Sequence, residues 1–208
     1  MTQGSYRARV FVSLLLGSLL FVSGARADTS DSYRSSYLLE SRGDVLGALA
    51  RMREIRKAAG PSYFTSLRTG WLAFLAHDLG AAETSYREAV SAKPNAIEAK
   101  LGLSLVLYMA QKWKPLETVC KQILAVDPKN MIARSRLAAG HYAAHNYPES
   151  AALYRKLMDE YPGDLDMQTG YAWALQRMGK RDEAQKIFRS VIAVSPDNPN
   201  ALQGLAAE

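Results

Sequence analysis

The residue types that most often carry metal or nucleophilic chemistry are scarce in this chain, which has three histidines and one cysteine. His141 and His145 are four residues apart, so on a continuous helix both imidazoles would face one side and could share a metal ion. The residues between them are Tyr-Ala-Ala, without the general-base glutamate of an HExxH zinc site. His77 lies far earlier in the sequence. We therefore expect one packed histidine, one histidine at a turn, and no metal site.

No nucleophile is set up for catalysis by its neighbours in the sequence. As the single cysteine, Cys120 can form neither an intramolecular disulfide nor a cysteine-based zinc site; we expect it in the core, with an exposed thiol that pairs between chains as the alternative. No segment resembles a Gly-x-Ser-x-Gly elbow or a phosphate-binding glycine loop. Asp182 and Glu183 begin an expected helix, where acidic side chains favour the positive helix end. The sequence therefore predicts a protein that is not an enzyme and that needs no cofactor.

The first 27 residues predict a secretory signal peptide. They contain no Asp or Glu, begin with Arg7 and Arg9, and continue with an apolar run over 10–22. Ala25 and Ala27 supply the small residues that a signal peptidase requires. The alternative is an uncleaved membrane anchor, for which a run of 13 residues is short, because a spanning helix needs about 20. We expect cleavage after Ala27, export to the bacterial periplasm, and no membrane association of the mature chain apart from a possible envelope complex.

Composition describes an ordinary folded protein of 208 residues, with 48% hydrophobic and 22% charged residues. The formal net charge is +6. Without the three arginines of 1–27, the 26 basic residues become 23 against 20 acidic ones, a balance of +3. Such a mild balance gives no support to nucleic-acid binding.

A 34-residue period organises the rest of the chain. Proline recurs at this interval at Pro94, Pro128, Pro162 and Pro196. Small residues recur at the same interval in two other columns, and apolar residues recur at two more. The register divides the chain into 29–62, 63–96, 97–130, 131–164 and 165–198, each expected to form two helices that end at the proline. In 63–96 the expected helices are 63–76 and 81–92. A leftover segment over 199–208 is expected to cap the array, with Leu202 and Leu205 packed on the fifth unit.

This pattern resembles the tetratricopeptide repeat (TPR) family over essentially all of 29–198. Repeat position 8 reads Ser36, Gly70, Ser104, Ala138 and Ala172, and position 20 reads Ala48, Ala82, Leu116, Ser150 and Ala184. Position 24 reads Met52, Tyr86, Cys120, Tyr154 and Phe188, and position 27 reads Ile55, Ala89, Ile123, Leu157 and Val191. No repeat carries the family's tryptophan at position 4. The resemblance implies an all-α fold, a right-handed α-solenoid of about five repeats in a single domain over 28–208.

The resemblance also implies where a partner would bind. In such arrays positions 2, 5, 9 and 12 of each first helix line a concave groove, and here they are rich in aromatic and aliphatic residues. Five basic side chains lie near them, namely Arg68, Lys100, Arg134, Arg136 and Arg177, too few to indicate a carboxylate clamp. Trp71 and Trp173 are expected to be the most exposed. The predicted groove residues are Phe64, Leu67, Trp71, Phe74, Leu105, Tyr108, Tyr142, Trp173 and Gln176, with Tyr33, Tyr37, Leu101, Ser135 and Thr169 at equivalent positions.

The function that these features favour is a non-enzymatic interaction scaffold in the periplasm. It would bind a protein or peptide partner in the groove, in envelope assembly or export, by analogy of fold and address. One alternative is carbohydrate binding, with the groove aromatics stacked on an exported polysaccharide. A second alternative is a homo-oligomeric structural protein.

Overall fold

The computed structural model describes residues 30–207, which form two compact units. The predicted signal segment 1–27 lies outside the described residues. The first unit ends at Ala92 and the second begins at Lys93. Every regular element in 30–207 is a helix, which confirms the predicted fold class. None of these helices is both long and apolar enough to span a bilayer.

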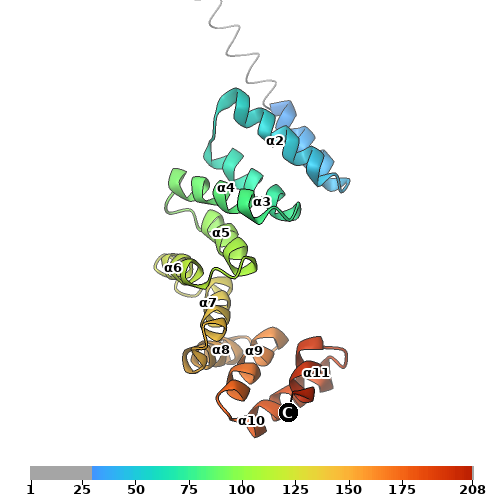
Figure 1. The fold of residues 1–208 in the computed structure, drawn as a ribbon, viewed down its shortest axis with the longest axis vertical. Coiled ribbons are helices and arrows are strands. Elements are labelled where there is room, and N and C mark those ends of the chain that lie inside the picture. Colours follow the sequence, from blue (N-terminus) through green and yellow to red (C-terminus); the bar gives the residue numbers. More distant parts are fainter. Residues whose placement is uncertain (1–29, 208) are drawn as a thin grey trace, which may run out of the picture. The chain divides into compact units, whose positions relative to one another are not determined.

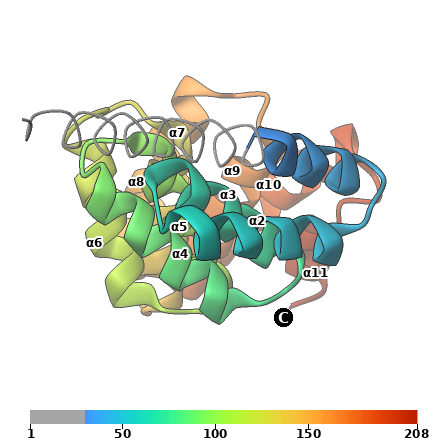
Figure 2. The same ribbon diagram turned by 90° about the horizontal axis from the view of Figure 1, so that it is seen from above.

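The helices follow one another in chain order in both units (Figure 1, Figure 2). The first unit contains a helix over 30–41, then α2 (Val45–Ala59), α3 (Tyr63–Leu75) and α4 (Leu79–Ala92). The second unit contains α5 (Ile97–Met109), α6 (Trp113–Leu124), α7 (Met131–Ala143), α8 (Tyr147–Glu160), α9 (Leu165–Arg177), α10 (Arg181–Val194) and α11 (Pro199–Ala206). Each predicted repeat therefore holds one helix pair. The second helix of 63–96 begins at Leu79, two residues before the predicted start.

The last residue of a repeat caps the first helix of the next one. Side-chain oxygens of Ser62, Asn130, Asp164 and Asn198 accept hydrogen bonds from first-turn amides of α3, α7, α9 and α11. Such caps satisfy amides that the helix itself leaves without partners. Ala96 occupies the same repeat position before α5 and supplies no side-chain cap. The 34-residue period thus specifies where helices begin as well as where they end.

The repeat positions predicted to be small or apolar are the buried ones. All five residues at position 8 and all five at position 20 are buried, and so are all five at position 27. Position 8 lies on a first helix and position 20 on a second helix. Small side chains there let the two helices approach closely. The predicted register is therefore confirmed by burial.

Two kinds of contact join successive repeats within each unit. Tyr154 and Phe188, the aromatic residues at position 24 in the second unit, lie over glycines of the next first helix, Gly170 and Gly204. Where position 24 is Cys120, an arginine takes the place of that glycine, and Arg136 donates to Ser104 Oγ at 2.6 Å. The repeat that follows Met52 likewise carries an arginine at this place, Arg68. A ring at position 24 and a large side chain on the next first helix cannot share this space. A ring is therefore matched with glycine there, and Cys120 is matched with arginine.

The turn between the two helices of each repeat contains one residue in the left-handed conformation. It stands at repeat position 15, and its φ is 82° at Gly43, 60° at His77, 55° at Gln111, 62° at His145 and 81° at Gly179. The next amide bonds back to a carbonyl of the last helical turn, as Lys180 N does to Leu175 O at 3.0 Å. This is the hydrogen-bond pattern of a Schellman C-cap.

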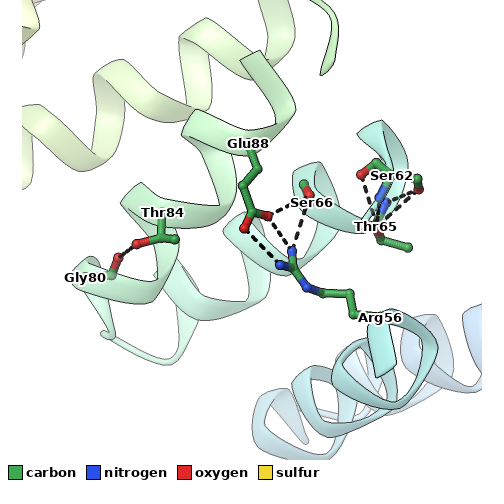
Figure 3. Close-up of polar contacts among 7 residues, drawn as sticks. All are labelled: Arg56, Ser62, Thr65, Ser66, Gly80, Thr84 and Glu88. Atoms are coloured by element: carbon green, nitrogen blue, oxygen red, sulfur yellow. Dashed lines mark hydrogen bonds and ion pairs between the residues drawn. The ribbon is translucent and has the colours of Figure 1, made fainter. Parts of the chain in front are cut away.

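A polar contact joins the three helices α2, α3 and α4 in the first unit (Figure 3). Both terminal nitrogens of Arg56 donate to the carboxylate of Glu88, at 2.7 and 3.0 Å. Ser66 Oγ also donates to Glu88, at 2.9 Å. The hydrogen bonds from Arg56 lower the pKa of Glu88, since they stabilise its charged form.

The cap helix packs differently from the prediction. Ala201 belongs to the hydrophobic core with Ala172 and Phe188, and Leu205 packs against that core. Leu202 is 47% exposed, so its predicted placement on the fifth repeat is wrong. Residues three or four apart share a helix face, and Ala201 with Leu205 occupies the inner one. Helix α11 packs against α9 and α10 (Figure 1).

Candidate functional site

The first unit presents a cluster of aromatic rings on α3. Phe64 is 65% exposed and Trp71 is 39% exposed, whereas Leu67 and Phe74 are partly buried. The rings of Trp71 and Phe74 are stacked, with centroids 6.0 Å apart. Phe64, rather than a tryptophan, is therefore the most exposed of the predicted groove residues on this helix.

Hydrogen bonds to one carboxylate hold this cluster in place. Glu40, on the helix over 30–41, accepts from Trp71 Nε1 and from Arg68 Nη1, each at 2.7 Å. Although its partial burial favours the neutral form, the hydrogen bonds from Trp71 and Arg68 lower the pKa of Glu40 below its usual value. Arg68 also donates to Ser36 Oγ, at 3.1 and 3.2 Å, and its guanidinium lies 3.5 Å from the ring centre of Tyr37. Arg68 is thus a structural residue, and the exposed surface of α3 is formed by the aromatic cluster.

The second unit contains a hollow of about 670 Å³ to which five aromatic side chains contribute. Three of them, Tyr108, Tyr142 and Trp173, were predicted as groove residues from their first-helix positions. The other two, Trp113 and Tyr154, come from second helices. The remaining lining residues are Ser135, Arg136, Ala139, Ala143, Asp166, Met167, Thr169, Gly170, Arg177, Asn200 and Gln203.

The aromatic rings of the hollow differ in how firmly the core holds them. Tyr108 is 37% exposed and meets Trp113 edge to face, with centroids 5.9 Å apart. Trp173 is partly buried, because its ring meets Phe188 of the core at 5.4 Å. Tyr154 is largely enclosed, and this burial raises the pKa of its hydroxyl far above the usual value. Tyr108 is therefore the ring that a partner could cover most readily.

Two predicted groove residues of the second unit do not line the hollow. Leu105 is partly buried on α5. Gln176 Nε2 donates to the carbonyl of Ala207 at 2.8 Å, so this side chain holds the end of the chain against α9. Its Oε1 atom is buried without a hydrogen-bond partner among the described residues. Thr169 is 2% exposed and bonds to carbonyls of its own helix, at Leu165 and Asp166, so it contributes little accessible surface.

The basic residues near the groove have mostly structural contacts. Arg136 donates to Leu101 O at 2.7 Å in addition to Ser104. Arg134 forms a bidentate pair with Glu160, at 2.6 and 2.7 Å. Arg177 Nε donates to the Tyr142 hydroxyl at 3.2 Å and is exposed. Lys100 is only 6% exposed. These contacts leave Arg177 as the basic group most available to a partner.

Residues 141–208 match the family model described as the tetratricopeptide repeat. The match covers the C-terminal part of the chain, which is therefore similar to the tetratricopeptide repeat family. Over most of its length the chain has the fold of solved TPR structures. A search of curated proteins found no match in sequence.

Several solved TPR structures share the fold at low sequence identity. A TPR protein from Parabacteroides merdae has a TM-score of 0.79 at 17% identity, covering 86% of this chain and 72% of its own. MamA from Desulfovibrio magneticus has a TM-score of 0.76 at 16% identity, covering 83% and 97%. YrrB, described as a TPR protein with an unusual peptide-binding site, has a TM-score of 0.71 at 16% identity, covering 83% and 89%. At these identities the likeness establishes the fold.

Two of the three histidines, His77 and His145, stand at turns in the left-handed conformation. Helix α7 ends at Ala143, and His145 stands beyond it in the left-handed turn position. The prediction of a histidine at a turn is confirmed at His145, so His141 and His145 do not share one face of a continuous helix. His145 Nδ1 instead lies 2.6 Å from the hydroxyl of Tyr147. Among the described residues no three His, Cys, Asp or Glu side chains gather closely enough to hold a metal ion.

Cys120 is part of the core, as predicted. The side chain is 0% exposed, and burial raises the pKa of its thiol to about 11. A thiol with so high a pKa is protonated near neutral pH and is a weak nucleophile. This environment contradicts the alternative of an exposed thiol.

Proposed function

We propose that this protein is a non-enzymatic scaffold that binds a segment of a partner protein, with the hollow of the second unit as its main contact. The observation that carries the proposal is the meeting of Tyr108, Tyr142 and Trp173 with Trp113 at one hollow. Large aromatic side chains give much contact area at low entropic cost, and they dominate the energetics of many interfaces. YrrB, with its described peptide-binding site, supports the proposal by analogy of fold.

The partner segment that fits best is apolar and carries at least one large side chain. The hollow is bordered by aromatic faces, and its Arg177 already donates to the hydroxyl of Tyr142. A partner that brought several unpaired charges would lose their hydration without enough new hydrogen bonds in return. An extended or helical apolar segment would instead bury its side chains against the rings.

The site of action is proposed to be the bacterial periplasm, in envelope assembly or export. The features that support this address are the apolar run over 10–22 and the Ala25-x-Ala27 motif. The expected mature chain begins at Asp28. An intact mass of the exported protein tests this, and a mass that includes residues 1–27 would contradict it.

A matched pair of tyrosine variants tests the binding surface. Tyr108 in the hollow and Tyr161 after α8 are each 37% exposed. The wild type, Tyr108→Ala and Tyr161→Ala proteins would be used as baits on an envelope extract, and captured proteins would be identified by mass spectrometry. Affinity for a purified captured partner would then be measured by calorimetry. We expect Tyr108→Ala to weaken binding by about tenfold or more, as for an interface hot spot, and Tyr161→Ala to leave it unchanged.

The other outcomes separate the alternatives. Equal binding by the two variants would contradict the proposed surface. Retention of the chain itself, with association that depends on concentration in sedimentation, would favour the homo-oligomer. Binding of oligosaccharides but not of proteins, if it is lost in Tyr108→Ala, would favour the alternative of carbohydrate binding. Tyr108 is preferred to Trp173 for this test, because truncation of Trp173 would also remove its contact with Phe188.

A further inference from the structure

A second hollow of about 550 Å³ lies where the start of α6 faces the end of α7. Apart from Trp113, it shares no residue with the hollow assigned to the partner segment. Its size falls in the range of sites for small molecules, which are mostly apolar with a few polar groups. The lining residues are Lys112, Trp113, Lys114, Pro115, Glu117, Leu137, Gly140, His141 and Ala144.

A glycine adds to the space of this hollow. Gly140 stands at repeat position 10, where the other repeats of the second unit carry the fully buried Val106 and Ala174. A Cβ atom added at Gly140 would meet only Leu116 Cδ2 within 4 Å, at 3.5 Å. The missing side chain therefore opens room beside α6. The walls that remain are apolar, formed by Trp113, Pro115 and Leu137.

The charged groups around this apolar space are mainly basic. Lys112, Lys114 and His141 contribute to the lining, and the one carboxylate, Glu117, is paired with Lys121 at 2.6 Å and also lies in the field of Lys114 and His141. Lys112, Lys114 and Lys121 each carry a positive charge and Glu117 carries a negative one, so their formal charge is +2 when His141 is counted as neutral. The residue before α6, Lys112, provides no side-chain cap, so the positive end of the helix dipole has no side-chain acceptor there.

We propose that this hollow binds a small organic anion with a flat apolar body. The body would lie against Trp113, Pro115 and Leu137, and the anionic group would face the two lysines and His141 at its edge. An apolar neutral molecule would use only the walls, and a small inorganic anion would use only the edge. The combination selects an amphiphilic anion, such as an aromatic sulfonate or carboxylate.

The test uses the full chain and two probes that differ in charge. Naphthalene-1-sulfonate and the neutral naphthalene-1-methanol would be titrated by calorimetry, with amide shifts followed by ¹H–¹⁵N NMR. Lys112→Gln with Lys114→Gln removes two charges at the hollow. Lys156→Gln with Lys186→Gln removes two exposed charges on α8 and α10, outside the lining, and serves as the control.

The expected result has three parts. The sulfonate shifts amides within 112–144 and binds more tightly than the alcohol. The Lys112 and Lys114 variant weakens sulfonate binding about fivefold, the size expected for two partly exposed ion pairs, and the control variant leaves it unchanged. Added salt weakens the binding to the wild type. Equal affinity of the two probes, an equal loss in both variants, or shifts centred elsewhere would each overturn the proposal.

Discussion

Two glycines in first helices of the second unit have opposite surroundings. Gly170 lies under the ring of Tyr154, and an added Cβ would stand 2.6 Å from ring carbons. Gly140 has only Leu116 Cδ2 nearby, at an ordinary contact distance of 3.5 Å. Both glycines lie inside helices, where alanine is intrinsically favoured. The same substitution should therefore have opposite signs at the two sites.

We predict that Gly140→Ala stabilises the protein and that Gly170→Ala destabilises it. The first gains about 0.5–1 kcal/mol from helix propensity. The second loses more than that gain, because overpacking a well-packed contact costs about 1–3 kcal/mol. Urea unfolding followed by circular dichroism measures both changes in the free energy of unfolding. Stabilisation by Gly170→Ala would show that Tyr154 can move aside at little cost.

At the scale of the element, each helix pair depends on one left-handed residue. Glycine occupies this place at Gly43 and Gly179, but His77, Gln111 and His145 occupy it in the three repeats between them. A residue with a Cβ pays a steric penalty there of about 1–2 kcal/mol. The chain therefore tolerates strain at three turns. Two of the three histidines, His77 and His145, stand at these turns.

The cost of the left-handed turn can be measured at Gly179. We predict that Gly179→Ala lowers the free energy of unfolding by about 1 kcal/mol, the penalty for a Cβ at positive φ. No atom lies within 4 Å of the added Cβ, so the loss would come from the backbone alone. Gly163 is the control, since it also has open space but not a left-handed φ. Equal effects of Gly179→Ala and Gly163→Ala on the urea midpoint would contradict the explanation.

At the scale of the whole molecule, the sequence predicts the repeat architecture well because each repeat places proline, small and apolar residues at the same positions. Pro94 and its equivalents end helices, and small residues such as Ser36 and Ala48 mark the close helix crossings. The site was predicted less completely. The groove rule considers first helices only, whereas Trp113 and Tyr154 reach the hollow from second helices. Trp113 follows a turn at repeat position 17, and a tryptophan at that place was the available signal.

One further error concerns the phase of the last helix. Leu202 is apolar and was predicted to pack, but the smaller Ala201 and Gly204 are buried instead, and Phe188 fills the space beside Gly204. This outcome does not follow from residue type alone, because it depends on the volume of a neighbouring side chain. The prediction of a histidine at a turn, by contrast, is confirmed at His145, which follows the end of α7 in the left-handed conformation.

The first unit should lose stability in acid, because two carboxylates hold its helices together. Glu40 joins the helix over 30–41 to α3, and Glu88 joins α2, α3 and α4. The pKa of each is lowered from 4.5 in the folded protein. A carboxylate with a lowered folded pKa adds stability above its unfolded pKa and loses it as the pH falls through the folded pKa. The loss should therefore occur below pH 4.5.

We predict that Glu40→Gln with Glu88→Gln lowers stability at neutral pH and flattens its decline in acid. Replacing Trp113 and Trp173 by phenylalanine in both proteins leaves Trp71 as the one tryptophan, so its fluorescence reports on the first unit. Urea midpoints measured from pH 6 to about pH 3 would then give the slope for each protein. Glu117→Gln is the control, since its pair with Lys121 lies in the second unit. An acid slope unchanged by the double variant would mean that other groups control the acid stability of the first unit.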